Sequence, residues 1–238
     1  MANDLAAMVF RIAAELGSRF DLAGAAGSAT QSAPNAEAIR NAITTAISEY
    51  QKERFRFNEI DPSVPSTFST IALRSVYTSA DSPLIGTAFY FDYLNIQIGN
   101  TLQQLGRVTP EQQHLNIQLY NQFGFPSSWA YEGNSIILYP VPDTAYTLYI
   151  GAHLNLAAPA TDNEAGNPWM TSAEALIRSR AKYEIATHVT RNPAMVKAMS
   201  PLPDGNDGRP GATYMFWRSL KGEANKVTGT SRIKPMRF

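Results

Sequence analysis

The 238-residue sequence contains no cysteine. This absence excludes disulfide bonds, zinc sites with thiolate ligands and cysteine nucleophiles. It also suits a protein that folds in a reducing cytoplasm, where disulfides rarely persist. Histidine is scarce as well, and the three histidines, His114, His153 and His188, show no metal-ligand spacing with one another or with acidic residues. The sequence therefore predicts neither a metal site nor a cofactor site.

The sequence has no excess charge of either sign, because 20 Lys and Arg residues balance 20 Asp and Glu residues. A protein that grips nucleic acid through the phosphates usually shows a basic excess. The balance therefore argues against tight non-specific DNA binding as the main function. It leaves room for a local basic patch.

Long apolar runs are also missing, since none approaches the roughly 18 residues of a membrane-spanning helix. The N-terminal segment does not have the pattern of a secretory signal. Asp4 stands where basic residues are expected, and Arg11 and Glu15 interrupt the apolar stretch. We therefore expect neither a secretory signal nor insertion into a membrane.

Common catalytic motifs are absent, because the sequence has no G-x-S-x-G and no G-x-x-x-x-G-K-[ST]. The glycine-rich loop over residues 204–211 follows no predicted strand, so we expect no phosphate cradle there. Asp92 and Glu132 are single carboxylates without a visible partner. His188 stands four residues after Glu184, which predicts a contact within one helix. These observations predict a protein that is not an enzyme.

Helical patterns occupy both ends of the chain. Apolar residues recur at helical spacing in four segments, over residues 4–16, 36–54, 169–192 and 212–226. Thr171 or Ser172 can cap the third of these helices. A shorter helix is predicted to begin after Thr109, with Leu115 and Leu119 on its apolar side.

The middle of the chain instead has patterns typical of strands. β-Branched and aromatic residues predict strands over residues 67–78 and 89–98. A β-hairpin is predicted further on, with strands at Ser135–Tyr139 and 146–150. Residues 140–143 would link the two strands, because their two prolines end a strand and set the bend.

The fold class predicted from these patterns is α+β. The N- and C-terminal helices would form a helical bundle with a central antiparallel β-hairpin or sheet and an extended C-terminal tail. We expect a single domain over residues 1–227, with a helical core from 1–57 and 169–227 and a β-rich insertion over 66–156. The tail, residues 228–238, has no helical period.

Aromatic residues are abundant, with 11 Phe, 11 Tyr and 3 Trp. Most of them must lie in the core, but several phenylalanines fall in loops between predicted elements. Aromatic side chains in such places commonly anchor protein interfaces. The candidate interface residues are Phe55, Phe57, Phe123 and Phe125, and a core position is the alternative for each.

The order of these segments resembles the head-to-tail adaptor (connector) proteins of tailed bacteriophages, over residues 36–192. The most specific part is FGFPSSWAYEGNSIILYPVPD followed by TAYTLYIGAHLNL, which looks like the family's central hairpin. The helix entry NPWMTSAEALIRSRAKYEIATHV is the next most specific part. The first matching helix, AIRNAITTAISEYQKERFRFNE, ends in a similar mixture of aromatic and basic residues.

The resemblance implies a structural virion protein at the head-tail junction, assembled in the host cytoplasm. Many copies, twelve by the resemblance, would form a ring below the portal protein. The ring would extend the DNA channel and provide the attachment platform for a tail tube or nozzle protein. DNA would pass through without specific binding, and zero net charge fits this conduit because strong phosphate binding would retard DNA.

The C-terminal tail carries the basic residues Arg232, Lys234 and Arg237 between apolar ones such as Ile233 and Phe238. One hypothesis is a frayed chain end. The other is a peptide that orders on a partner, with the apolar residues as anchors and the basic residues paired with carboxylates. By the resemblance, this partner is the portal protein.

Two other functions fit part of the sequence. A receptor- or carbohydrate-binding tail protein would use the aromatic-rich β region for stacking on sugars, but this leaves the C-terminal helices and the basic tail unexplained. A hydrolase whose active site assembles from distant residues is the second alternative.

Overall fold

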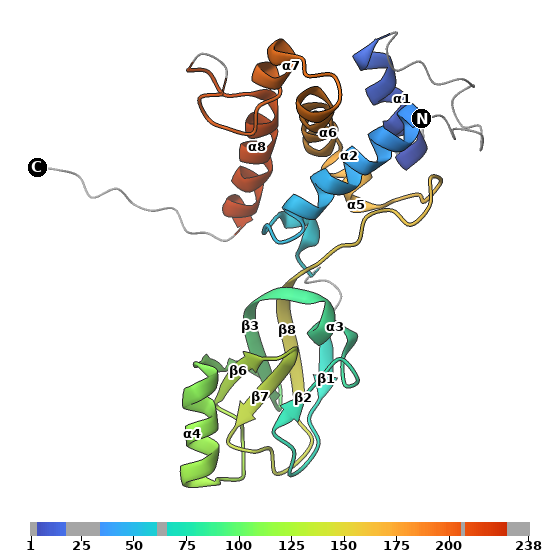
Figure 1. Ribbon diagram of the computed structural model, residues 1–238. Helices are drawn as coiled ribbons and strands as arrows, with labels where there is room; N and C mark the ends of the chain where they lie inside the picture. Colours follow the sequence, from blue (N-terminus) through green and yellow to red (C-terminus); the bar gives the residue numbers. More distant parts are fainter. Residues whose placement is uncertain (1–3, 18–33, 61–65, 206–207, 228–238) are drawn as a thin grey trace, which may run out of the picture. The chain divides into compact units, whose positions relative to one another are not determined.

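The computed structural model describes residues 4–17, 34–60, 66–205 and 208–227. The chain divides into two compact units (Figure 1): unit 1 comprises residues 1–57 and 156–238, and unit 2 comprises residues 58–155. The described residues form eight α-helices and two four-stranded sheets, which confirms the predicted α+β class. The predicted tail, residues 228–238, lies outside the described residues.

Unit 1 is helical and is organised around one long helix. Its helices in the described residues are α1 (Leu5–Leu16), α2 (Pro34–Tyr50), α5 (Pro168–Thr171), α6 (Glu174–His188), α7 (Pro193–Ala198) and α8 (Ala212–Val227). α6 contacts all five of the others. The core forms where the apolar stripes of α1, α2 and α6 meet, and it includes Ile12, Ile39, Ile43, Ile47, Leu176 and Ile177.

Trp169 of α5 packs against two aromatic side chains in this core. Its side chain is fully buried, and its indole N–H donates a hydrogen bond to the carbonyl oxygen of Leu156 at 3.1 Å. The ring meets Phe55 and Phe57 edge-on, with centroid distances of 6.5 and 5.1 Å. Edge-to-face pairs add about 0.5–1.5 kcal/mol beyond the buried area.

The predicted cap of the long helix is wrong. Asn167 caps the short helix α5 instead, where its side-chain oxygen accepts from the Trp169 N–H at 3.1 Å. α6 begins after Ala173 and has no side-chain cap. The chain therefore turns once around Trp169 before the long helix starts, and the buried ring, not Thr171 or Ser172, sets where α6 begins.

Ion pairs fasten α6 to its neighbours. The Arg180 guanidinium binds Glu49 of α2 in a bidentate manner, with Nε–Oε2 and Nη2–Oε1 distances of 2.5 and 2.7 Å. Arg178 and Lys182 reach Glu15 of α1 at 3.1 and 2.6 Å. The basic residues of α6 thus face acidic residues of α1 and α2, and these ion pairs add to the apolar contacts between the three helices.

Unit 2 contains two packed sheets. Its elements are β1 (Thr67–Ser69), β2 (Val76–Tyr77), α3 (Pro83–Thr87), β3 (Ala88–Ile98), β4 (Thr101–Gln104), β5 (Gly106–Arg107), α4 (Pro110–Tyr120), β6 (Ser128–Glu132), β7 (Ser135–Tyr139) and β8 (Thr147–Leu154). The strand orders are β1-β8-β3-β4 and β2-β7-β6-β5, and all pairs are antiparallel except β5–β6. Their shared core includes Phe68, Phe91, Leu94, Trp129, Ile136, Leu138, Leu148 and Ile150.

The predicted hairpin between Ser135–Tyr139 and residues 146–150 is wrong. These two strands belong to different sheets, and residues 140–146 carry the chain from one sheet to the other. β7 pairs with β6 through the turn at Gly133 and Asn134, whose φ angles are +54° and +60°. Two successive positive φ angles give a turn whose twist matches that of antiparallel strands, so the short connection is favoured.

The predicted strand over residues 89–98 is confirmed as β3. The predicted strand over 67–78 is wrong in its centre, because a turn separates β1 from β2. The apolar side assigned to the helix after Thr109 is also wrong. Leu115 and Leu119 of α4 are exposed, and the only buried residue of this helix is Gln113.

Candidate functional site

The four candidate interface phenylalanines differ in burial and lie in two different units. Phe55 is fully buried in the core of unit 1, so it packs the fold and presents nothing to a partner. Phe57 is partly buried and stacks on Phe55 with a centroid distance of 5.1 Å. In unit 2, Phe125 packs edge-on against Tyr146, whereas Phe123 is 54% exposed. The candidate tail residues 232–238 lie outside the described residues.

Charge is divided unevenly between the two units. Residues 58–155 contain two basic residues and seven acidic ones, so unit 2 has a formal net charge of −5. The basic residues are Arg74 and Arg107, and the acidic ones are Glu59, Asp61, Asp81, Asp92, Glu111, Glu132 and Asp143. Since the whole chain is neutral, unit 1 carries +5. Unit 2 thus has few charges over a large surface, and that surface carries many exposed apolar side chains.

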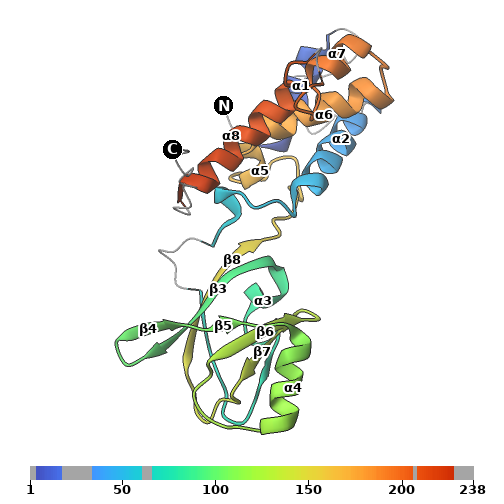
Figure 2. The ribbon, with the colours of Figure 1, turned by 90° about the vertical axis from the view of Figure 1, so that its left-hand side faces the viewer.

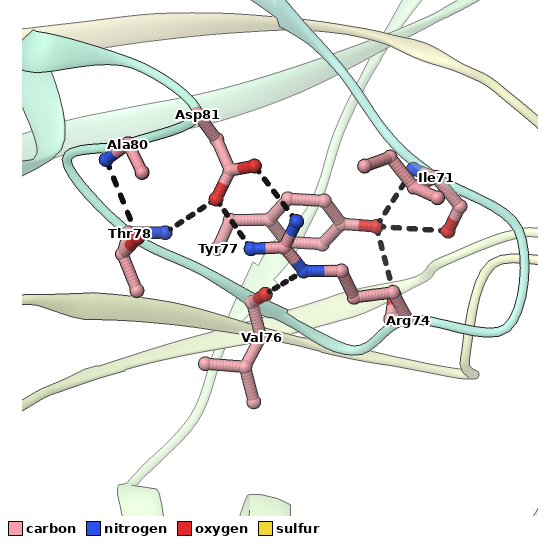
Figure 3. A network of polar contacts seen from close by, with 7 residues as sticks. All are labelled: Ile71, Arg74, Val76, Tyr77, Thr78, Ala80 and Asp81. Atoms are coloured by element: carbon pink, nitrogen blue, oxygen red, sulfur yellow. Dashed lines mark hydrogen bonds and ion pairs between the residues drawn. The ribbon is translucent and has the colours of Figure 1, made fainter.

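The first exposed apolar group comprises Ile71 and Leu73, on the loop between β1 and β2, and Val76 at the start of β2. Figure 3 shows Ile71 and Val76 with the polar residues around them. A dense polar network holds this loop. The Tyr77 hydroxyl donates to the Arg74 carbonyl oxygen at 2.7 Å and accepts from the Ile71 N–H at 3.1 Å. The Arg74 guanidinium pairs with both Asp81 carboxylate oxygens, at 2.9 and 2.6 Å. These contacts join the two ends of the loop to β2 and to the turn after it.

Leu73 stands in a strained conformation within this loop. Its φ angle is +64°, and its side chain is 71% exposed. The left-handed region costs an L-residue roughly 1–2 kcal/mol, and an exposed side chain recovers little of this by packing. The Leu73 N–H donates to the Pro142 carbonyl oxygen at 2.7 Å, which helps to hold the backbone in place. The fold thus holds a large apolar side chain out into water at an energetic cost.

We expect the Leu73→Gly variant to be more stable than the parent by up to about 1 kcal/mol. Glycine removes the left-handed strain but adds about 0.5–1 kcal/mol of backbone entropy cost. Leu102→Gly is the matched control, because Leu102 is an exposed leucine without a positive φ angle, and this variant should lose about 0.5–1 kcal/mol. Chemical denaturation of both variants measures the difference. A clear loss at Leu73→Gly would show that this leucine packs in the folded state.

The second exposed apolar group lies on α4 and the loop after it. The helix is attached by the buried Gln113, whose amide donates to the carbonyl oxygens of Ser128 and Ile137 at 3.2 and 3.0 Å. Leu115 and Leu119 lie on the side of the helix away from Gln113, whereas Tyr120, seven residues after Gln113, lies on the same side as Gln113 at the C-terminal end. The exposed side chains of the helix and of the loop after it, called the α4 surface below, are Leu115, Leu119, Tyr120 and Phe123.

The third exposed apolar group is the tip of the β3–β4 hairpin, which turns at residues 99–100. Ile98 and Leu102 are 43% and 56% exposed. No charged residue occurs between positions 93 and 106. β4 is the last strand of its sheet, and within the described residues no strand pairs with its outer edge. Ile98, Leu102 and this edge are called the hairpin surface below.

A polar cluster lies in unit 2 around His153, which is buried. Its Nδ1 is 3.0 Å from the Asn58 side-chain oxygen, and its Nε2 is 3.4 Å from Asp92 and 3.8 Å from Glu59. Asn58 and Glu59 lie where the chain enters unit 2, and His153 lies near where it leaves. The cluster thus ties the two ends of the unit together. Asp92 therefore has a partner, contrary to the prediction from the sequence.

The other two histidines each contact a glutamate. His114 lies 2.7 Å from Glu132, so the prediction that this carboxylate lacks a partner is also wrong. His188 lies 3.3 Å from Glu184, as predicted from the helical spacing. The contacts of Asp92 and Glu132 join residues far apart in the sequence, so no local pattern indicates them. In the described residues, no group of three or more His, Asp or Glu side chains is arranged to hold a metal ion.

Unit 1 contains a shallow cavity of about 350 Å³ between α2, α6 and α8. Its walls include Glu49, Tyr50, Glu53, Arg180, Tyr214 and Trp217. Burial raises the pKa of Tyr50 to about 12 and outweighs the nearby Arg180, which lowers it. Glu49 is already bound to Arg180, and Glu53 is paired with Lys221. The polar groups of this cavity are thus largely engaged with one another.

None of the helices in the described ranges combines the length and the apolar character needed to cross a bilayer. The chain matches no protein-family model and no curated protein sequence at a significant level.

Proposed function

We propose that this chain is a structural head-to-tail adaptor of a tailed bacteriophage, without enzymatic activity. Copies of it form a ring below the portal protein, and the ring extends the DNA channel and receives the tail tube or nozzle protein. The proposal places the protein in the virion after assembly in the host cytoplasm. Twelve copies are expected, by the resemblance of the sequence to this family.

The observation that carries the proposal is the apolar, charge-poor surface of unit 2. Its three exposed groups, which are the group of Ile71, Leu73 and Val76, the α4 surface and the hairpin surface, present large apolar side chains to water. Clustered exposed apolar side chains are typical of surfaces that bind other proteins. A chain with several such surfaces is suited to assembly with several neighbours, as in a ring that also contacts a portal and a tail.

The charge of unit 2 supports the same function. Its net charge of −5 would repel phosphate groups, and its two arginines are engaged: Arg74 with Asp81, and Arg107 with the rings of Tyr90 and Trp129 at 5.8 and 5.2 Å. A surface without available cations does not retain DNA. Such a unit could border a channel through which DNA slides.

The test is to mix the purified chain with portal rings from the same phage genome. We expect small species for the chain alone in size-exclusion light scattering, and a ring of added copies on the portal in negative-stain images. A ring needs different surfaces that close on one another, and here the portal would template that closure. A stable twelve-fold ring without portal would contradict the assembly order, and failure to bind portal rings would reject the proposal.

A truncated variant ending at Gly229 tests the tail. We expect the same thermal unfolding as the parent but at least about tenfold weaker portal binding, since many tails on one ring add avidity. A variant with Arg232, Lys234 and Arg237 all changed to Gln separates the basic residues from the apolar anchors. Portal binding by the truncated variant at the parent's affinity would reject the portal-binding role of the tail.

A further inference from the structure

We infer that His153 is a pH-sensitive link between the two ends of unit 2. In its protonated form the side chain holds the segment that enters the unit against the segment that leaves it, and loss of the proton weakens this contact. The role does not depend on the proposed function, because it concerns how unit 2 is held together, whatever the unit binds.

Oxygen atoms face both ring nitrogens of His153, and the residue is only 4% exposed. Nδ1 lies 3.0 Å from Oδ1 of Asn58, while Nε2 lies 3.4 Å from Oδ2 of Asp92 and 3.8 Å from Oε1 of Glu59. A neutral imidazole has one N–H and can donate on one side only, whereas the imidazolium has an N–H on each side. The arrangement therefore favours the charged form.

An irregularity in β3 places the nearest carboxylate. β3 and β8 run side by side (Figure 2), and their pairing shifts between Phe91 and Tyr93, so Asp92 is the extra residue of a β-bulge. A second shift precedes Tyr90, the residue paired with His153. Bulges re-aim side chains and are frequent beside functional sites. Here one of them accompanies the contact between a carboxylate and a buried histidine.

The contact joins the two segments at which the chain enters and leaves unit 2. Asn58 and Glu59 are the first residues of the unit, and His153 lies near its end. Glu59 and His153 form an isolated antiparallel bridge, and the Ile60 N–H donates to the Ala152 carbonyl oxygen at 2.9 Å. The side-chain charges therefore reinforce a short backbone connection between the two segments.

Burial and the carboxylates act in opposite directions on the protonation of this ring. Burial disfavours a charged imidazole, and a carboxylate within about 4 Å favours it. Phe89 and Tyr90 lie against the ring, with centroid distances of 6.1 and 6.3 Å. Charge interactions in such surroundings are stronger than in water. Two carboxylates on one nitrogen and an amide oxygen on the other thus shift the balance toward the imidazolium.

Other titratable groups of the adjoining elements have contacts of their own. The Arg107 guanidinium, which opposes protonation, lies 5.8 Å from the centre of the Tyr90 ring and donates to the Phe91 carbonyl oxygen at 3.3 Å. On β8, the Tyr149 hydroxyl donates to a glutamine side chain at 3.0 Å. Arg56, in the same turn as the entry segment, lines a cavity of unit 1. Asp61 lies outside the described residues.

The stability of unit 2 should therefore fall as the pH rises. A histidine that holds its proton more tightly in the folded chain than in the unfolded chain stabilises the fold below its unfolded pKa of about 6.5. This stabilisation is lost as the pH rises through the pKa of the folded form. A neutral ring would leave one ring nitrogen facing an oxygen atom with no proton between them, which is costly in a buried cluster.

NMR spectroscopy of the full chain tests this proposal, because the chain has only three histidines. The variants His114→Gln and His188→Gln identify the remaining signals as those of His153. At pH 7 we expect nitrogen-15 signals of a ring protonated on both nitrogens, and loss of the proton at least about one pH unit above the ordinary value of about 6.5. A singly protonated His153 ring at pH 7 would overturn the proposal.

The Asp92→Asn variant separates charge from packing, because the amide nearly keeps the shape of the carboxylate. We expect the titration of His153 to move down by about one pH unit in this variant. Asp143→Asn is the matched control, since it makes the same change at an exposed aspartate of the same unit, bound to the Tyr146 hydroxyl at 2.7 Å. This control should leave the titration unchanged. An equal titration of His153 in Asp92→Asn and in the parent would contradict the proposal.

Stability is then measured by denaturant titration at pH 6 and pH 8.5, followed through the amide signals of β8, which belong to unit 2. In the parent we expect the unfolding equilibrium constant to rise at least about tenfold between the two pH values. This pH dependence should be absent in His153→Gln and retained in His114→Gln. The same pH dependence in His153→Gln as in the parent would reject the link. If His153→Gln does not fold, the titrations of the parent and of Asp92→Asn still decide the question.

Discussion

Replacing Trp169 with alanine should lower the free energy of unfolding of unit 1 by about 3–5 kcal/mol. The ring is fully buried and contacts Phe55 and Phe57 edge-on, so its removal leaves a cavity that the helices fill only in part. The variant also removes the hydrogen bond from the indole N–H to the Leu156 carbonyl oxygen, which still accepts from the Gln51 side-chain amide at 3.0 Å. The main loss is therefore the apolar contact of the ring.

Hydrogen exchange is the measurement for this variant, because it reports each unit separately. We expect the amides of α6 to exchange much faster than in the parent, and those of β7 to stay protected, since Trp169 belongs to the core of unit 1. Trp169→Phe is the matched control. It retains an aromatic ring against Phe57 and should lose less stability than the alanine variant. Unchanged protection of α6 in Trp169→Ala would show that the ring is not central to this core.

The second large effect is expected at Leu138 of β7. Its side chain is fully buried and lies opposite Trp129 of β6, while its N–H donates to the Ser75 carbonyl oxygen at 2.8 Å. Serine keeps the backbone bond, but it removes apolar contacts and buries a hydroxyl. We expect Leu138→Ser to lose about 2–5 kcal/mol, and Ile136→Ser to lose a similar amount because Ile136 is also fully buried.

Leu115→Ser is the control for this pair of variants. It makes the same chemical change within unit 2, but Leu115 is 47% exposed. A surface substitution of this kind usually changes stability by less than about 0.5 kcal/mol. Thermal unfolding followed by circular dichroism should therefore separate Leu138→Ser from Leu115→Ser clearly. Equal melting temperatures for Leu138→Ser and the parent would contradict the position of β7 in the core.

Local patterns predicted the parts of the fold that depend on neighbouring residues. The stripe of Ile39, Ile43 and Ile47 predicted the buried side of α2, because residues three or four apart share one face of a helix. The dense aromatic and β-branched run predicted β3. The contact between Glu184 and His188 followed from the same helical spacing. In each case the information lies within one element.

Interactions between distant segments were not predictable in the same way. Gly and Asn, as at positions 133 and 134, favour turns, yet no local pattern states which strands β7 pairs with. Its partners are β2 and β6, and not the expected strand at 146–150. His153 meets Asp92 and Glu59 only because β3 pairs with β8 and the backbone at Glu59 forms an isolated bridge with His153. Such contacts depend on how sheets stack, and no periodicity within one segment encodes that.

The exposure of the candidate interface residues also depends on contacts between distant segments. By itself, the sequence determined that disulfides and thiolate metal sites are excluded, and that the ends are helical and the middle is rich in strands. The tertiary structure decided that Phe55 is core, that Leu115 and Leu119 face water, and that Leu73 is held in a left-handed conformation. The physical reason is that exposure is a property of a residue's neighbours in space. A leucine at helical spacing is apolar wherever it stands, but only the packing of α4 through Gln113 determines that its leucines point away from the core.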